Sequence, residues 1–245
     1  MNTDIISETY RYQDDNSDKF WRIEYASDAL AVNYGKTGTI GKYQMKWFDT
    51  EEECKKEANK LIASKVKKGY KPYPEFDMNR HFYMDCRDED TSRGPHPLTS
   101  HPKFRQHFTD EFYYDSGEDA APFGNDEGAE TLYTLEDDVR KYKAFDFISF
   151  PQKYVTESWG MTYYSPTENT SKDDIENVLK TDEGEMGLTN GDIVIYATAL
   201  AQVKITGRID TELKMMAINA MKRKLISDEI LGYDYANETL KKNDK

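Results

Sequence analysis

The chain has 245 residues, and its 46 acidic side chains outnumber the 33 basic ones to give a net charge of −13. The longest near-apolar run, residues 193–203, is too short to cross a bilayer, and only Cys54 and Cys86 are available for disulfides. Membrane-spanning and disulfide-rich classes are therefore excluded. Because the opening residues are polar and acidic and do not resemble a secretory signal, we expect a cytoplasmic protein of more than one domain.

Charge is distributed unevenly along the chain. Residues 1–80 hold 14 basic and 14 acidic side chains, so residues 81–245 carry the whole net charge. Within the first part, residues 17–73 hold 12 basic and 8 acidic side chains. Phosphate groups would be attracted to this segment and repelled by the acidic remainder. An excess of acid that serves only solubility explains the second part equally well.

Residues 1–16 are expected to form a polar N-terminal arm, and residues 20–48 show the two-residue period of β-strands. Apolar Trp21, Ile23 and Tyr25 alternate with charged neighbours, and two further alternating runs follow after turn residues. Strands that follow one another with short turns pair antiparallel. The pattern predicts a three-stranded antiparallel meander.

A helix is predicted directly after the meander. Thr50 is a suitable N-cap, and Glu53, three residues on, completes a capping-box pattern. Apolar residues recur at helical spacing, and Gly69 is a plausible stop after a lysine-rich last turn. The stripe expected to face the sheet consists of Cys54, Ala58, Leu61 and Ile62. Residues 17–73 therefore form an antiparallel sheet packed with one helix.

The rest of the chain is predicted to be an acidic, mainly α-helical domain. Residues 74–103 contain four prolines and are expected to be a linker, residues 104–236 the domain, and residues 237–245 a frayed tail. Residues 142–165 are aromatic and β-prone, whereas Ser171, Asp192 and Asp210 are expected to open helices. The predicted fold class is α+β.

The segment from Gly35 to Gly41 is rich in glycine but is not a phosphate-binding P-loop. That motif needs four residues between its glycines and a Lys-Ser/Thr pair, whereas here Lys42 is followed by Tyr43. Glycine is also common in hairpin turns, where it adopts positive φ. Taken alone, the segment favours a turn between two strands.

The wider pattern resembles the WGR domain, named after a Trp-Gly-Arg triplet and found in poly(ADP-ribose) polymerases and in bacterial relatives of a molybdate-metabolism regulator. The resemblance covers residues 17–73, and its motifs are FWRI at 20–23, YGKTGTIGK at 34–42 and WF at 47–48. The sequence departs from the triplet because Tyr34 replaces Trp and Lys36 replaces Arg. Both replacements keep the aromatic or cationic character.

The resemblance implies contact with DNA or RNA. Carried over to this chain, Tyr34 would stack on a base or sugar, and Lys36 and Lys42 would neutralise phosphates. Alternatively, Tyr34 packs on the helix as an ordinary sheet residue and Lys36 is a solvated turn residue. Nothing resembles an ADP-ribose-transferring catalytic domain, so no polymerase activity is expected.

A second resemblance covers nearly the whole chain. Beyond residue 100 the sequence is similar to bacterial YfeS-like proteins, in which a WGR domain precedes a domain of undefined activity. The matching segments are HPKF at 101–104, DEFYYD at 110–115, APFGND at 121–126 and AQVKITGRID at 201–210. This resemblance implies a domain order but no reaction.

Residues 110–138 hold 11 carboxylates and no basic residue. They lack the ligand spacing of an EF-hand, so we expect no metal site, no cofactor and no catalytic residues. The aromatic residues among the carboxylates also suit a surface that binds a protein partner. We therefore expect a non-enzymatic nucleic-acid-associated protein. The alternatives are a protein-interaction module without nucleic-acid binding and, less favoured, a metal-dependent enzyme that uses the acidic cluster.

Overall fold

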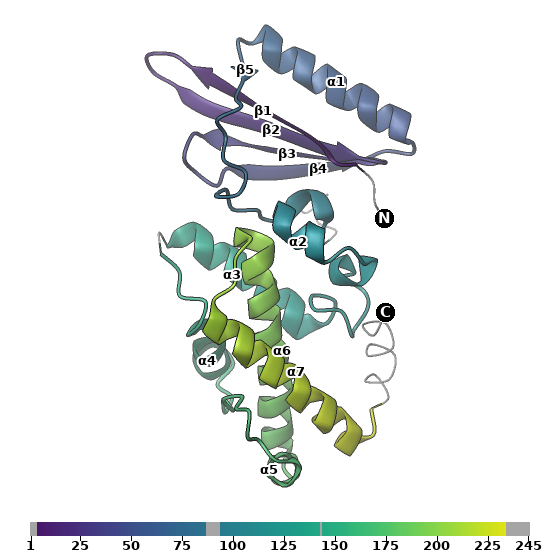
Figure 1. Cartoon of the computed structure of the whole chain (residues 1–245), viewed down its shortest axis with the longest axis vertical. Coiled ribbons are helices and arrows are strands. Elements are labelled where there is room, and N and C mark those ends of the chain that lie inside the picture. The colour runs from purple at the N-terminus through teal and green to yellow at the C-terminus, as the bar shows by residue number, and fades with distance from the viewer. Residues whose placement is uncertain (1–3, 87–93, 143, 234–245) are drawn as a thin grey trace. The chain divides into compact units, whose positions relative to one another are not determined.

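The computed structural model describes residues 4–86, 94–142 and 144–233, and the chain divides into two compact units. Unit 1 comprises residues 1–114 with 204–207, and unit 2 comprises residues 115–203 and 208–245. A sheet dominates the first unit and helices form the second (Figure 1). The predicted α+β class, with an N-terminal sheet-and-helix module and a mainly helical remainder, is confirmed.

Unit 1 is built on a five-stranded sheet with strand order β4-β3-β2-β1-β5, and all neighbouring strands are antiparallel. The strands are β1 (Ile6–Gln13), β2 (Asp18–Ala26), β3 (Ala29–Lys36), β4 (Lys42–Trp47) and β5 (Lys71–Pro72). The predicted three-stranded meander corresponds to β2, β3 and β4. The expected arm at residues 1–16 is wrong for Ile6–Gln13, because β1 pairs with β2 along its whole length and Tyr10 enters the core.

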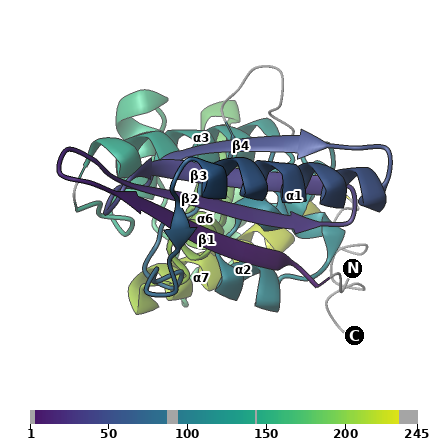
Figure 2. The same ribbon diagram turned by 90° about the horizontal axis from the view of Figure 1, so that it is seen from above.

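Helix α1 (Glu51–Lys67) covers one face of this sheet, as predicted. The Thr50 hydroxyl accepts a hydrogen bond from the Glu53 amide at 3.2 Å. At the other end Gly69 has φ +88°, and the Tyr70 amide donates to the Lys65 carbonyl. This pair of features is a Schellman-type stop, which turns the chain back toward β5. Viewed from above, β4 lies beside α1 rather than under it (Figure 2).

The opposite face of the sheet is covered by residues that follow β5. Residues 74–103 are expected from the sequence to be a linker. Their described parts, 74–86 and 94–103, contain no long helix or strand but contribute buried Tyr83, Met84 and Leu98. The Arg22 guanidinium of β2 donates a 2.9 Å hydrogen bond to the Tyr83 hydroxyl. The short helices of this layer are η1 (Pro97–Thr99), α2 (Pro102–His107) and η2 (Glu111–Tyr114). The segment is therefore part of unit 1, which continues to residue 114.

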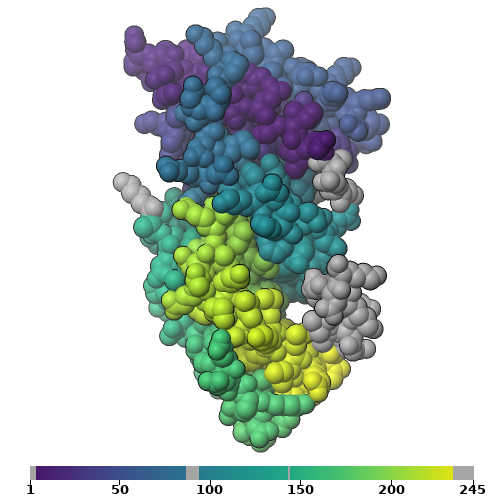
Figure 3. Space-filling model, in the orientation of Figure 1, coloured from purple at the N-terminus to yellow at the C-terminus, as the bar shows by residue number. Residues whose placement is uncertain are grey.

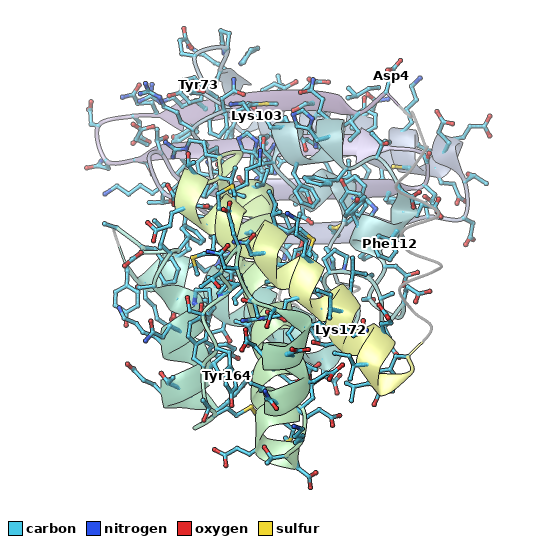
Figure 4. The ribbon with its side chains drawn as sticks, turned by 60° about the horizontal axis from the view of Figure 1, so that its bottom comes forward. Asp4, Tyr73, Lys103, Phe112, Tyr164 and Lys172 are labelled. Atoms are coloured by element: carbon cyan, nitrogen blue, oxygen red, sulfur yellow. The ribbon has the colours of Figure 1, made fainter. Side chains whose placement is uncertain are left out.

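Helices are the regular elements found among the described residues of unit 2, with no strand there, so the β-prone pattern at 142–165 is misleading. Its helices are α3 (Asp126–Lys141), α4 (Phe150–Lys153), the π-turn η3 (Tyr154–Ser158), α5 (Lys172–Val178), α6 (Asp182–Thr206) and α7 (Thr211–Leu231). Ser171 caps α5 with a full capping box, as expected. Lys172, labelled in Figure 4, pairs with Glu229 of α7 at 3.0 Å. The expected frayed tail, residues 237–245, lies outside the described residues.

Asp192 does not open a helix. It lies inside α6, which begins ten residues earlier at Asp182, and its carboxylate is fully buried. Arg223 of α7 binds it at 2.7 Å, so a residue with poor helix propensity is retained for an internal ion pair.

No helix among the described residues is long and apolar enough to span a membrane.

Candidate nucleic-acid interface

Strand register places several cations around one aromatic ring. On the face that β3 shares with α1, Tyr34 lies directly opposite Lys42, and Lys36 lies two residues further along β3. The open part of this face, the Tyr34 face, consists of Val32, Tyr34, Lys36, Lys42, Gln44 and Lys46. Because side chains alternate along a strand, all six point to the same side of the sheet. The structure thus brings together Tyr34, Lys36 and Lys42, the three candidate binding residues from the sequence.

Tyr34 is half-buried and has two kinds of neighbour. Part of its ring packs against the core between the sheet and α1, as the sheet-residue alternative supposed. The ring also lines two grooves, so it remains reachable from outside. The first groove has a volume of about 500 Å³. Its lining residues are Asn16, Ser17, Asp18, Lys19, Phe20, Tyr34, Gly35, Lys36 and Tyr70.

Two lysines face each other at the first groove. Lys19 of β2 is paired in register with Lys36 of β3, and neither forms an ion pair with a described residue. Like charges directly opposite on a sheet are destabilising. Such a local conflict is typical of a binding site, where an anionic ligand would relieve it.

The one carboxylate in this groove is already engaged. Asp18 receives two hydrogen bonds from the Arg11 guanidinium, at 2.8 and 2.6 Å, and one from the Thr37 hydroxyl at 2.6 Å. These bonds lower the pKa of Asp18 to about 2. Arg11 also lies 5.1 Å from the ring of Tyr73, which Figure 4 labels. The space-filling view in Figure 3 shows the residues of the strands and α1 in purple to blue.

Lys65 is a candidate binding residue that the sequence analysis missed. Its ammonium lies 5.3 Å from the Trp21 ring centre, 6.0 Å from that of Tyr34 and 5.1 Å from that of Tyr70. Burial, with a smaller effect from Lys68, lowers the pKa of Lys65. In the sequence, a lysine in the last helical turn indicates only a favourable interaction with the helix dipole. The aromatic neighbours come from three separate elements, so no local signal could identify it.

The glycine-rich segment is the hairpin turn that its composition predicted, and it has a steric role at the site. A Cβ on Gly35 would lie 2.9 Å from the Cα of Gly41. Gly41 itself has φ +75°, and a Cβ there would lie 2.7 Å from both the Phe20 ring and the Tyr34 carbonyl. Only glycine permits this close approach, which holds Lys36 and Lys42 on either side of the turn.

Charges on the opposite face of the sheet are buried and paired. Arg22 lies 3.0 Å from Glu24, and Arg105 of α2 binds the same carboxylate at 2.8 and 3.1 Å. Burial alone would raise the pKa of Glu24, but Arg22 and Arg105 outweigh it and lower that pKa. His81 packs beside this cluster, and its Nε2 lies 2.8 Å from the Asn33 Oδ1. This network joins the sheet to its second layer and offers no open surface.

The carboxylates of the acidic segment, residues 110–138, are not arranged as metal ligands. Among the described residues, no group of three or more His, Cys, Asp or Glu side chains is placed to hold a metal ion. Phe123, Leu132 and Leu135 of this segment are buried, whereas Tyr133 is 60 % exposed. These three residues therefore serve the core of unit 2, and Tyr133 remains on the surface among carboxylates.

Comparison with known proteins supports the sequence resemblances. Residues 7–77 match the WGR domain family, and this range includes β1 from Ser7 onward. The protein YfeS of Escherichia coli (strain K12) is 43 % identical over 228 residues, covering 93 % of this chain and 91 % of YfeS. Protein YehF of the same organism is 46 % identical over 59 residues, 24 % of this chain and 22 % of YehF. A crystal structure from Bacteroides fragilis shares 44 % identity over 29 % of this chain and 20 % of that one, with a TM-score of 0.28.

Proposed function

Because the chain belongs to the YfeS family of WGR-domain proteins, we propose that it binds nucleic acid through the Tyr34 face, without catalysing a reaction. WGR domains are a nucleic-acid-binding type of module. The two cysteines are buried and form no disulfide, which agrees with a reducing cytoplasm as the place of action.

The observation that carries this proposal is the set of lysines around one accessible aromatic ring. Within the described residues, Lys19, Lys36 and Lys42 are exposed and form no salt bridge, although Lys36 is close enough to Asp18, and Lys19 to Asp14, to lower the pKa of those carboxyls. Each can neutralise a phosphate and release condensed counterions. The Tyr34 ring, anchored on one side by the core, presents its remaining surface to a base or sugar. Backbone contacts from lysine and stacking on tyrosine together suit binding with little sequence preference.

The test is a binding titration of the full chain with blunt duplex DNA, nicked duplex, single-stranded DNA and RNA at two salt concentrations. We expect micromolar or weaker affinity that falls as salt rises. Lys36→Ala with Lys42→Ala should reduce the log–log salt slope by about two units, because each phosphate contact contributes roughly 0.9 on duplex DNA. The matched control, Lys55→Ala with Lys56→Ala, removes the same charge from exposed positions of α1 that line neither groove. Absence of binding to every probe at low salt would overturn the proposal.

A second candidate function is protein binding at the acidic surface of α3. The observation in its favour is Tyr133, which is 60 % exposed on a helix rich in carboxylates. Exposed tyrosines are frequent at protein interfaces. This candidate would take first place if the chain bound no nucleic acid and Tyr133→Ala abolished capture of one defined basic partner.

A further inference from the structure

We infer that the second groove beside Tyr34 holds the base of an unpaired nucleotide, so that the protein prefers single-stranded segments and overhangs to blunt duplex. The inference rests on the proposed function and specifies the form of nucleic acid that the same face accepts.

The second groove differs in chemistry from the first. It has a volume of about 360 Å³ and lies between α1 and the strands β3 and β4. Apolar side chains dominate it, with one amide and two ammonium groups. Its lining residues are Trp21, Leu30, Val32, Tyr34, Gln44, Met45, Lys46, Leu61 and Lys65. This volume is near the lower end of the roughly 300–1,000 Å³ found for small-molecule pockets, which suits a group of about the size of one base.

Gln44 gives the groove a means of contacting a base edge. Its side chain is exposed, lies opposite Val32 in the register, and makes no hydrogen bond with the described part of the chain. A primary amide both donates and accepts hydrogen bonds, as base edges do. A base resting on Val32 and Leu61 would therefore find an apolar support and one polar contact.

The lysines on either side of Tyr34 define a path for a strand. Lys19 and Lys36 line the first groove, whereas Lys46 and Lys65 line the second, and Tyr34 lines both. A strand that crosses the Tyr34 ring would thus meet cations before and after it. Lys46 also lies 3.4 Å from Glu57, but this is an exposed pair of the kind that contributes little.

Base pairing decides which nucleic acids can use the second groove. In a blunt duplex the pairing edge of every base is occupied and, apart from the outer face of each terminal pair, so are the faces of the bases. An unpaired base exposes both, and stacking on aromatic side chains contributes about 1–3 kcal/mol per base. The first groove, which offers lysines to phosphate, does not distinguish the two forms. Any preference for unpaired nucleotides must therefore come from the second groove.

The experiment measures fluorescence anisotropy of the full chain with a blunt duplex, the same duplex bearing a short overhang, and the overhang strand alone. We expect the overhang duplex to bind at least about fivefold more tightly than the blunt one, the lower limit set by one stacked base. Lys65→Met, which keeps much of the aliphatic stem, and Gln44→Ala should each reduce that ratio toward one. Lys67→Met is the matched control, since Lys67 is an exposed lysine of α1 outside both grooves.

The outcomes separate this inference from the proposed function. Equal affinity for blunt and overhang probes would overturn the inference alone if Lys36→Ala with Lys42→Ala still weakened both. An overhang preference that survives both Lys65→Met and Gln44→Ala would also overturn it. Gln44→Ala keeps the test decisive if Lys65→Met fails to fold, because Gln44 is exposed on an edge strand. No binding to any probe would instead refute the proposed function.

Discussion

The two faces of the unit 1 sheet treat positive charge in opposite ways. On the face covered by residues 76–86 and 94–107, Arg22 is 2 % exposed and pairs with Glu24, which also binds Arg105. On the Tyr34 face, Lys36 and Lys42 are exposed and form no salt bridge with a described residue. A one-residue change of position along a strand moves a side chain from one face to the other. The place of a cationic residue in the alternating pattern of its strand therefore decides whether it stabilises the fold or remains available to a ligand.

The difference follows from the cost of desolvation. A buried guanidinium that loses its carboxylate leaves an uncompensated charge, which is strongly destabilising. An exposed lysine stays hydrated, so it needs no partner and can exchange water for a phosphate. The first face therefore affects folding and the second affects binding, and the two can be altered separately.

The largest effect is expected from removing one of the two layers that cover the faces of the sheet. A fragment of residues 17–73, the module boundaries suggested by the sequence motifs, lacks β1 and the residues that cover Arg22 and Glu24. We expect it to show no cooperative thermal melt by circular dichroism. The full chain, which keeps both layers and residues 204–207 of unit 1, should melt cooperatively. A cooperative transition in the fragment would contradict a core that requires both layers.

Glu24→Gln should destabilise the protein more than any single substitution on the Tyr34 face. It removes the shared partner of Arg22 and Arg105, and breaking such a buried pair costs about 3–5 kcal/mol. Urea denaturation of the full chain measures the loss of unfolding free energy. Glu229→Gln, which breaks the exposed pair with Lys172, is the control and should cost less than about 1 kcal/mol. Equal losses would mean that the buried network is not a major source of stability.

Mildly acidic pH should lower the free energy of unfolding through the buried face of the sheet before it affects the Tyr34 face. Burial, followed by the nearby charges of Arg22 and His101, lowers the pKa of His81 to about 3. Below the unfolded value of about 6.5 the unfolded chain binds a proton that the folded chain does not, so stability falls with pH. The loss from His81 reaches about 2 kcal/mol at pH 5 by this linkage. His96, with its pKa lowered to about 4 chiefly by burial, adds to the loss.

Denaturation midpoints measured between pH 7 and pH 5 check this expectation. His81→Gln removes one titrating group, so the variant should lose less stability over this interval than the natural sequence. Parallel pH profiles for the two proteins would show that His81 does not titrate as its environment indicates.

The smallest effect is expected from the ring on the exposed face. Tyr34→Leu should weaken binding to single-stranded DNA by about fivefold, which corresponds to the lower end of the roughly 1–3 kcal/mol that stacking contributes per base. The salt slope should not change, because stacking releases no counterions. Salt titrations of the two proteins with one probe give both quantities. A changed slope would indicate that Tyr34 positions the neighbouring lysines instead of contacting the nucleic acid.

Local signals in the sequence were sufficient for several elements. Thr50 and Gly69 marked the two ends of α1, the two-residue period predicted β2, β3 and β4, and Ser171 marked the start of α5. Each of these rests on contacts between residues close in the chain, such as caps and turns. The motif around Tyr34 likewise located the candidate site, because the hairpin that carries it is local.

Only the tertiary structure decided which residues complete the sheet and the site. The opening residues become β1 because they pair with β2, and the proline-rich segment is buried because Tyr83 meets Arg22, 61 positions earlier in the chain. Lys65 acquires three aromatic neighbours from β2, β3 and the turn after α1. Asp192 tolerates a helix interior because Arg223 neutralises it. Each depends on partners distant in the chain, and hydrophobic periodicity contains no information about such partners.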